Sequence, residues 1–94
     1  MDAFSIAVVE RLMPLLRRRG IRMSDRVLRQ MCERHDIVVL KRGRYYDACE
    51  QMRCGDMTYP VFILAQGCKS RSAAMELAIV RVVKESAQLK GCVR

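Results

Sequence analysis

Three cysteines and the chain's one histidine are spaced as two pairs of metal ligands. Cys32 and His35 are three residues apart on a predicted helix, and Cys49 and Cys54 follow after a predicted turn. Thiolates and imidazoles are the usual ligands of tetrahedral zinc, so Cys32, His35, Cys49 and Cys54 are the candidate zinc ligands. The alternative is that the cysteines are small core residues and the histidine is hydrogen-bonded in the core. We favour this alternative, and we therefore predict no cofactor.

This spacing is similar to that of the cysteine-rich nucleic-acid-binding proteins of carlaviruses, which are also short and basic. In that family a basic run precedes a Cys-x2-Cys pair, and a Cys-x4-Cys pair follows. Here His35 stands where the family has a cysteine, and the aromatic residues around the family's finger are missing. The resemblance, which is confined to spacing, implies nucleic acid as the ligand.

A second set of residues with binding chemistry is a run of arginines. Residues 17–44 hold ten of the 18 Lys and Arg residues against three of the 10 Asp and Glu residues, a net +7 out of the formal +8. A concentrated positive field attracts polyanions by releasing their counterions, and a guanidinium pairs with phosphate through two parallel hydrogen bonds. We therefore predict a nucleic-acid-binding face that consists of Arg17, Arg18, Arg19, Arg22, Arg26, Arg29, Arg34, Lys41, Arg42 and Arg44.

Two tyrosines follow this run directly. Bases stack on tyrosine and arginine side chains, so this neighbourhood suits nucleic acid. In a strand, however, Tyr45 and Tyr46 point to opposite faces. We predict that Tyr45 joins the binding face and that the other tyrosine belongs to the core.

The stretch from Leu15 to Tyr46 is similar to a winged helix-turn-helix. A helix ends at Gly20, a second helix follows, and a hairpin with a basic tip comes next. The resemblance implies that the second helix enters the major groove and that the tip touches the DNA backbone. A complete motif usually has three helices before its wing, and only two are evident here. The alternative is a pair of packed helices and a hairpin without this role.

The start of the last predicted helix looks like the end of a double-stranded-RNA-binding domain. Gly67-Cys68-Lys69-Ser70-Arg71 precedes alanines at positions 73, 74 and 78. The resemblance implies that Lys69 and Arg71 clamp phosphates across a groove, and three strands before the helix fit it. The family's lysine pair is reduced to these two residues, and its middle-loop Gly-Pro-x-His is absent. An ordinary capped helix is the favoured alternative.

Periodicity and turn residues predict a single small α+β domain over residues 1–94, in the order α-α-β-β-β-α. The predicted fold has two N-terminal helices, a small three-stranded antiparallel sheet and a long C-terminal helix. Phe4, Val8, Leu12, Leu15 and Leu16 recur at helical spacing in a first helix of about 16 residues, which Pro14 kinks or restarts and Gly20 ends. Ser24 caps a second helix, which Asp36 ends.

Strands are predicted at 37–40, from 45 onward and at 58–65, with Gly43 in the first turn. Pro60 indicates either an edge strand or the first position of a strand. The stretch 47–53 fits either a strand or a short helix. Ser70 or Ser72 caps a last helix that runs to about Leu89. That helix is apolar over most of its circumference, so either the first helix or a second subunit covers its other side. We predict a homodimer or a higher homo-oligomer through this helix.

Enzyme signatures are absent, because the chain has no phosphate-cradling glycine loop and no paired histidines. No apolar stretch approaches the roughly 20 residues that span a bilayer, so no membrane partner is expected. The five cysteines are an odd number, and no secretory segment precedes them. We therefore expect an intracellular protein, in the cytoplasm or nucleus, where thiols stay reduced. The composition also suits a viral accessory protein.

These features together predict a small basic non-enzymatic protein that binds nucleic acid through an arginine-rich face. RNA binding, or binding that depends on nucleic-acid structure, is favoured over sequence-specific DNA binding. One alternative is a protein-interaction or oligomerisation module with an acidic protein partner. Another is a DNA-binding regulator of the winged helix-turn-helix kind.

Overall fold

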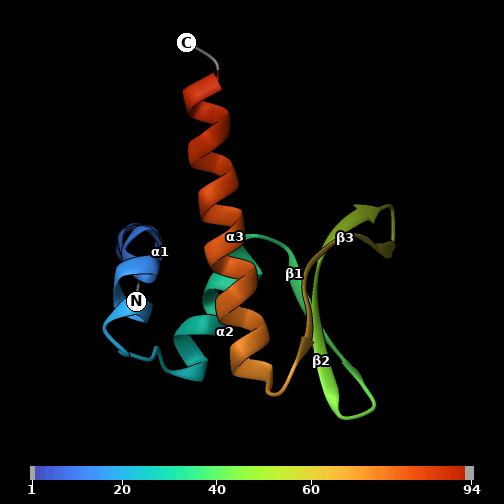
Figure 1. Cartoon of the computed structure of the whole chain (residues 1–94). Helices are drawn as coiled ribbons and strands as arrows, with labels where there is room; N and C mark the ends of the chain where they lie inside the picture. The colour runs from blue at the N-terminus through green and yellow to red at the C-terminus, as the bar shows by residue number, and fades with distance from the viewer. Residues whose placement is uncertain (1, 93–94) are drawn as a thin grey trace.

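The computed structural model describes residues 2–92, in which a three-stranded sheet has its helices on one face (Figure 1). The elements are α1 (Ala3–Arg18), α2 (Asp25–Arg34), β1 (Ile37–Arg42), β2 (Tyr45–Cys54), β3 (Met57–Cys68) and α3 (Arg71–Cys92). All neighbouring strands pair antiparallel, in the order β1-β2-β3. The predicted α+β class and the predicted order of elements are therefore confirmed.

Helix α1 begins at a capping aspartate and ends at a glycine. The Asp2 carboxylate accepts a hydrogen bond from the Ser5 backbone N–H at 2.8 Å. Gly20 adopts φ +71°. Its N–H donates to the Arg17 carbonyl at 3.0 Å, and the Ile21 N–H donates to the Leu16 carbonyl at 2.9 Å. The helix is assigned without a break through Pro14, so the predicted restart does not occur.

The face of α1 that packs into the core is not the predicted apolar face. The exposed side chains of that predicted face are Phe4, Val8, Leu12 and Leu15. Ile6, Glu10 and Met13 are buried instead. Glu10 joins α1 to α2, because its Oε2 lies 3.0 Å from His35 Nε2 and its Oε1 lies 3.8 Å from Arg34 Nε. The core-facing side of α1 thus includes the Glu10 carboxylate, whereas the valine and leucines that were predicted to face the core are exposed.

From Ser24 to Gly43, the helix cap and the turns lie where the sequence predicts them. The Ser24 hydroxyl accepts a hydrogen bond from the Val27 N–H at 3.4 Å, as an N-cap does. Asp36 takes φ +53° after α2, and its carbonyl accepts the Gln51 N–H at 2.8 Å. Gly43 takes φ +62° at the first of the two positions between β1 and β2. A type II′ hairpin turn requires a positive φ at that position.

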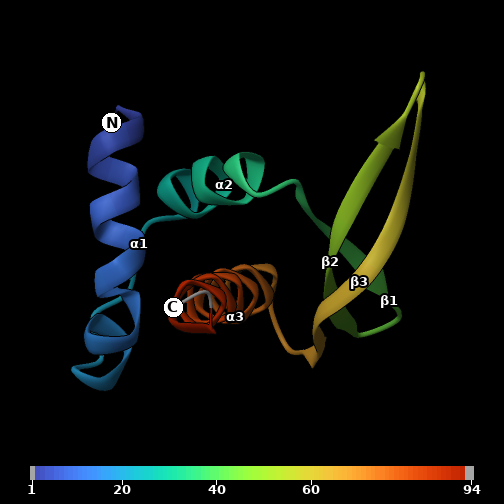
Figure 2. The same ribbon diagram turned by 90° about the horizontal axis from the view of Figure 1, so that it is seen from above.

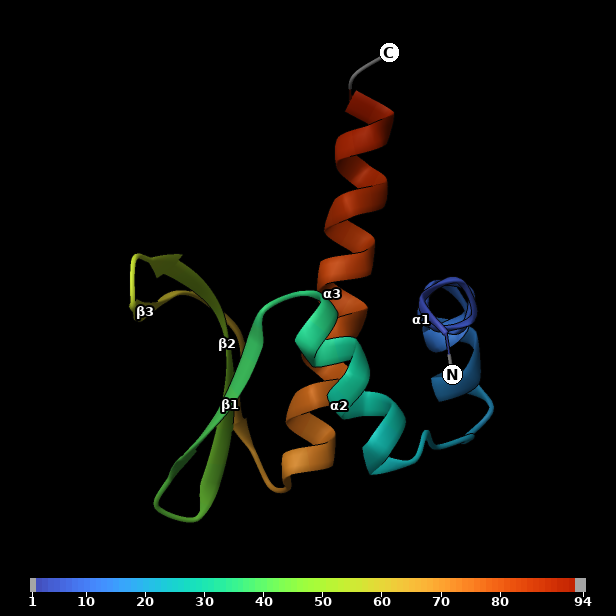
Figure 3. The ribbon, with the colours of Figure 1, turned by 180° about the vertical axis from the view of Figure 1, so that it is seen from behind.

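The sheet extends beyond the predicted strands. The stretch 47–53 is strand, and β2 beyond Glu50 pairs with β3 but not with β1. The β2–β3 hairpin therefore projects past the end of β1 (Figure 3). Pro60 lies opposite Gln51 on β3, which is an edge strand as predicted.

Helix α3 lies among the other elements, with α1, α2 and the sheet around it (Figure 2). Its buried residues are Ala74, Met75, Ala78, Ile79 and Val80. Because α1 and α2 supply a second cover, these residues need no second subunit. The predicted dimer through this helix stays a prediction, and Leu89 at its far end lies outside the described side chains.

We expect the substitution Met31→Ala to lower the free energy of unfolding by about 2–5 kcal/mol, because it leaves a cavity where a fully buried side chain stood. Met52→Ala is the matched control, since Met52 is exposed and its truncation should change stability by about 0.5 kcal/mol or less. Urea denaturation of both variants measures the difference. Equal losses of unfolding free energy in the two variants would contradict the burial of Met31 in the core.

Candidate nucleic-acid interface

The starts of α2 and α3 and the β1–β2 turn lie at the same end of the molecule, opposite the C-terminal end of α3 (Figure 3). We call this the basic end. Its exposed cations are Arg26, Arg29, Lys41, Arg42, Arg44, Lys69 and Arg71. The N-terminus of a helix adds a partial positive charge and unpaired N–H groups, so two helix starts strengthen the attraction for phosphate.

Hydrogen bonds hold the two helix starts together. The Ser72 hydroxyl, in the first turn of α3, donates to the Asp25 carboxylate at the first position of α2. The Ser70 hydroxyl caps α3 by accepting the Ala73 N–H at 3.1 Å. The two helices therefore present their N-termini side by side.

Asp47 of β2 ties Arg42 of β1 to the end of β3. Its carboxylate accepts hydrogen bonds from Arg42 Nε and from the Gly67 N–H, both at 2.9 Å. The hydrogen bond from Arg42, followed by that from Gly67, holds the pKa of the Asp47 carboxyl below its usual value. The carboxylate thus stays ionised at neutral pH and offsets part of the charge of Arg42.

Arg71 connects α3 with the sheet and with α2. Its guanidinium lies over the Tyr46 ring, 5.7 Å from the centroid. Arg29 of α2 lines the same shallow hollow of about 220 Å³ as Arg71. Two guanidiniums from different helices therefore border one hollow, whose remaining residues are Cys32, Glu33, Ile37, Val38, Val39 and Met75.

The two tyrosines separate as the alternation predicts. Tyr45 is exposed beside the β1–β2 turn, where a base has access to its ring. Tyr46 is half-buried and packs against the core. At the basic end, stacking is thus open to Tyr45 and not to Tyr46, whose ring is covered by Arg71.

The predicted arginine-rich face is divided in the structure. Arg17, Arg18, Arg19 and Arg22 are exposed at the end of α1 and in the loop that follows it. Figure 2 shows α1 and the sheet on opposite sides of α3. The charge of Arg17 nevertheless acts on the Cys68 thiol at the end of β3, and Arg22 lies just before the start of α2. Arg34 lies near the buried Glu10 and not with the basic end. Lys69 and Arg71, from a distant part of the sequence, join it instead.

The four candidate zinc ligands do not come together. Cys32 lies in the core, and His35 contacts Glu10 at 3.0 Å. Cys49 is buried within β2, whereas Cys54 is exposed at its end, about 16 Å farther along an extended strand. Across the part of the chain that the structure describes, no three His, Cys, Asp or Glu side chains form a group that could hold a metal.

The environments of the cysteines predict very different reactivities. Burial, together with the charges of Glu10 and Glu33, raises the pKa of the Cys32 thiol to about 12. Burial also raises the pKa values of Cys49 and Cys68. The thiolate is the reactive form, so these thiols should be inert in the folded protein.

In a Cys92→Ser background we expect one fast-reacting thiol, that of Cys54, when the native protein meets a thiol reagent at pH 8. The other three should react only after urea unfolds the chain. The further change Cys54→Ser should remove the fast phase. A fast phase that survives this change would contradict the burial of the other cysteines.

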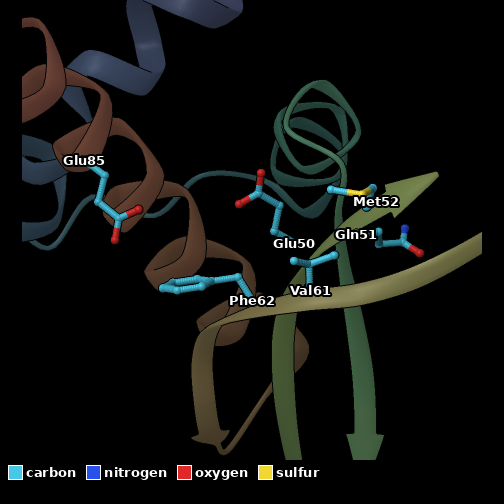
Figure 4. A pocket seen from close by; sticks show the side chains of 6 residues that line it. All are labelled: Glu50, Gln51, Met52, Val61, Phe62 and Glu85. Atoms are coloured by element: carbon cyan, nitrogen blue, oxygen red, sulfur yellow. The ribbon is translucent and has the colours of Figure 1, made fainter. Parts of the chain in front are cut away.

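A second hollow, of about 280 Å³, differs chemically from the basic end (Figure 4). It lies between the β2–β3 hairpin and α3, and is lined by Glu50, Gln51, Met52, Val61, Phe62 and Glu85. Arg81 beside it is already engaged, since it lies 5.1 Å from the Phe62 ring centroid and bonds Glu85 at 3.2 Å. Two carboxylates and an apolar wall make this hollow unsuited to phosphate.

Sequence reasoning missed the two carboxylates that position the basic end. These carboxylates are Asp25 at the start of α2 and Asp47 in β2. Their partners Ser72 and Gly67 are 47 and 20 residues away along the chain. No local signal in the sequence could have found these pairs.

None of the helices, over the residues described, is long and apolar enough to cross a bilayer. Comparisons of the chain with protein-family models, with curated proteins and with solved structures gave no match. Its function is therefore inferred from the charges and contacts of the basic end.

Proposed function

We propose that this chain is a small non-enzymatic nucleic-acid-binding protein that binds RNA through its basic end. The observation that carries the proposal is that seven exposed cations belong to two helices, the loop before α3 and a hairpin, and that the two helix starts and the hairpin turn lie at the same end of the molecule (Figure 3). The Ser72–Asp25 hydrogen bond joins the two helix starts, and Asp47 links Arg42 of β1 to Gly67 near the end of β3. These hydrogen bonds fix the elements that carry the cations relative to one another, which lowers the cost of ordering the surface on binding.

Duplex RNA is the form of nucleic acid that this arrangement favours. The cations come from three separate elements, which suits contacts to phosphates on more than one side of a groove. Three strands followed by a helix with a basic start also match the resemblance to a double-stranded-RNA-binding domain. Because most of these contacts would go to phosphates, we expect recognition of shape with weak selectivity for sequence.

The test is a fluorescence-anisotropy panel of four probes: duplex RNA, single-stranded RNA, duplex DNA and single-stranded DNA. We expect the tightest binding to duplex RNA, and weaker binding of every probe when salt rises from about 50 to 200 mM. Tight binding confined to particular DNA sequences would favour a winged helix-turn-helix regulator. No binding to any probe at low salt would contradict the proposal and favour an acidic protein partner.

We also propose that the protein works inside the cell, in a reducing compartment. Cys32, Cys49, Cys54 and Cys68 are all free thiols, and three of them are buried side chains. Buried thiols of this kind fill space in the core rather than form cross-links.

A further inference from the structure

Helix α1 is apolar on two opposite sides. One side packs into the core through Ile6 and Met13. The opposite side forms a stripe whose exposed fractions are 79% for Phe4, 44% for Val8, 44% for Leu12 and 53% for Leu15. A surface helix of a single domain carries polar residues on the side away from its core. An exposed stripe of this kind is typical of a surface that another molecule covers.

We propose that a second copy of this chain covers the stripe, in a symmetric dimer whose two α1 helices pack antiparallel. The apolar residues are spaced by four, four and three positions, so the stripe has nearly the same pattern in both directions along the helix. In an antiparallel pair Phe4 meets the partner's Leu15, and Val8 meets the partner's Leu12. A self-complementary patch of this kind is what a two-fold interface requires.

The charges at the two ends of α1 select the antiparallel orientation. Asp2 stands at the N-terminal end, and Arg18 and Arg19 stand exposed at the C-terminal end. Antiparallel packing places Asp2 near the partner's Arg18 and sets the two helix dipoles in opposite directions. Parallel packing would instead bring the arginines of both copies together. The pattern thus complements another copy of α1.

The symmetry of this dimer has a consequence for binding, which rests on the proposed function. Figure 2 is a view along α3 and shows α1 lying across that direction. The two-fold axis of an antiparallel helix pair is perpendicular to both helices, so here it runs roughly along α3. Both basic ends then point the same way, and one duplex can engage both with increased avidity.

The test measures the assembly state of the full chain without nucleic acid, so its failure is distinct from failure of the proposed function. Sedimentation of the wild type from about 1 to 100 µM should show a dimer with a micromolar dissociation constant, as a small interface gives. The double variant Val8→Glu, Leu12→Glu should be a monomer with unchanged circular dichroism, and its melting temperature should match that of the wild type below the dissociation constant of the dimer. The matched control is Met57→Glu, Val61→Glu, which changes two apolar residues of β3 that are more exposed than Val8 and Leu12, and it should stay dimeric.

Cross-linking tests the orientation independently. In a Cys54→Ser, Cys92→Ser background, a mixture of Phe4→Cys and Leu15→Cys chains should form mostly mixed disulfides. Parallel packing predicts homodisulfides instead and would overturn the proposal. A wild-type chain that stays monomeric at the highest concentration would also overturn the proposal, whether or not it binds anionic vesicles. A dimer that dissociates in the variant Val83→Glu but not in the double variant Val8→Glu, Leu12→Glu would overturn it as well.

Discussion

Replacing both Arg26 and Arg29 by Glu is expected to lower the affinity for duplex RNA about 100-fold, or about 2.7 kcal/mol of binding free energy. Both side chains are exposed on the outer face of α2, and Arg29 borders the hollow that it shares with Arg71. Each reversal removes a charge-assisted hydrogen bond to phosphate and adds a repulsive carboxylate at the same place. Anisotropy titrations at constant salt measure the change.

The matched control is the double reversal Arg53→Glu, Lys84→Glu, which changes the net charge by the same amount. Arg53 lies near the β2–β3 turn and Lys84 on the later part of α3, both exposed and away from the basic end. Salt screens charges beyond roughly 10 Å, so we expect a loss of no more than about threefold. Equal losses in the two variants would place the binding surface elsewhere on the protein.

Salt dependence provides the second large effect. If four to six cations of the basic end contact phosphate, the logarithm of the affinity for a duplex should fall linearly with the logarithm of salt concentration, with a slope of about −4 to −5. A rise from about 50 to 200 mM salt then weakens binding roughly 250- to 1000-fold. The substitutions Arg29→Ala and Arg71→Ala should each make the slope shallower by about one. A flat salt dependence would exclude phosphate contacts as the source of affinity.

The order of elements could be predicted from the sequence because its signals are local. Gly20 and Gly43 mark backbone positions with positive φ, and Ser24 and Ser70 mark helix starts. These features act within three or four residues of themselves, so they can be recognised without the fold. The same is true of Pro60, which limits its strand to the edge of the sheet.

The burial of α1 could not be predicted in the same way. Helical spacing identifies two faces but does not say which one meets the rest of the chain. Glu10 is buried because Arg34 and His35 of α2 lie beside it, and this contact exists only after folding. The apolar stripe then faces outward, although by hydrophobicity alone it would be the preferred core face.

The candidate site was predicted in part. The starts of α2 and α3 and the β1–β2 turn lie at one end of the molecule, and Lys69 and Arg71 stand at the start of α3. The phosphate-binding role that the RNA-binding-domain resemblance implies for these two residues stays a prediction. The end of α1 and the sheet lie on different sides of α3, but the charge of Arg17 acts on Cys68 at the end of β3. Spacing along the sequence therefore does not tell which of these arginines lie together.

The most direct test of the central claim is a map of amide chemical-shift changes when duplex RNA is added to the labelled protein. We predict that the largest changes cluster at the first turns of α2 and α3 and at the β1–β2 turn, with Gly43 and Arg71 among them. Changes concentrated on the β2–β3 hairpin or on the exposed face of α1, or no changes at low salt, would contradict binding through the basic end.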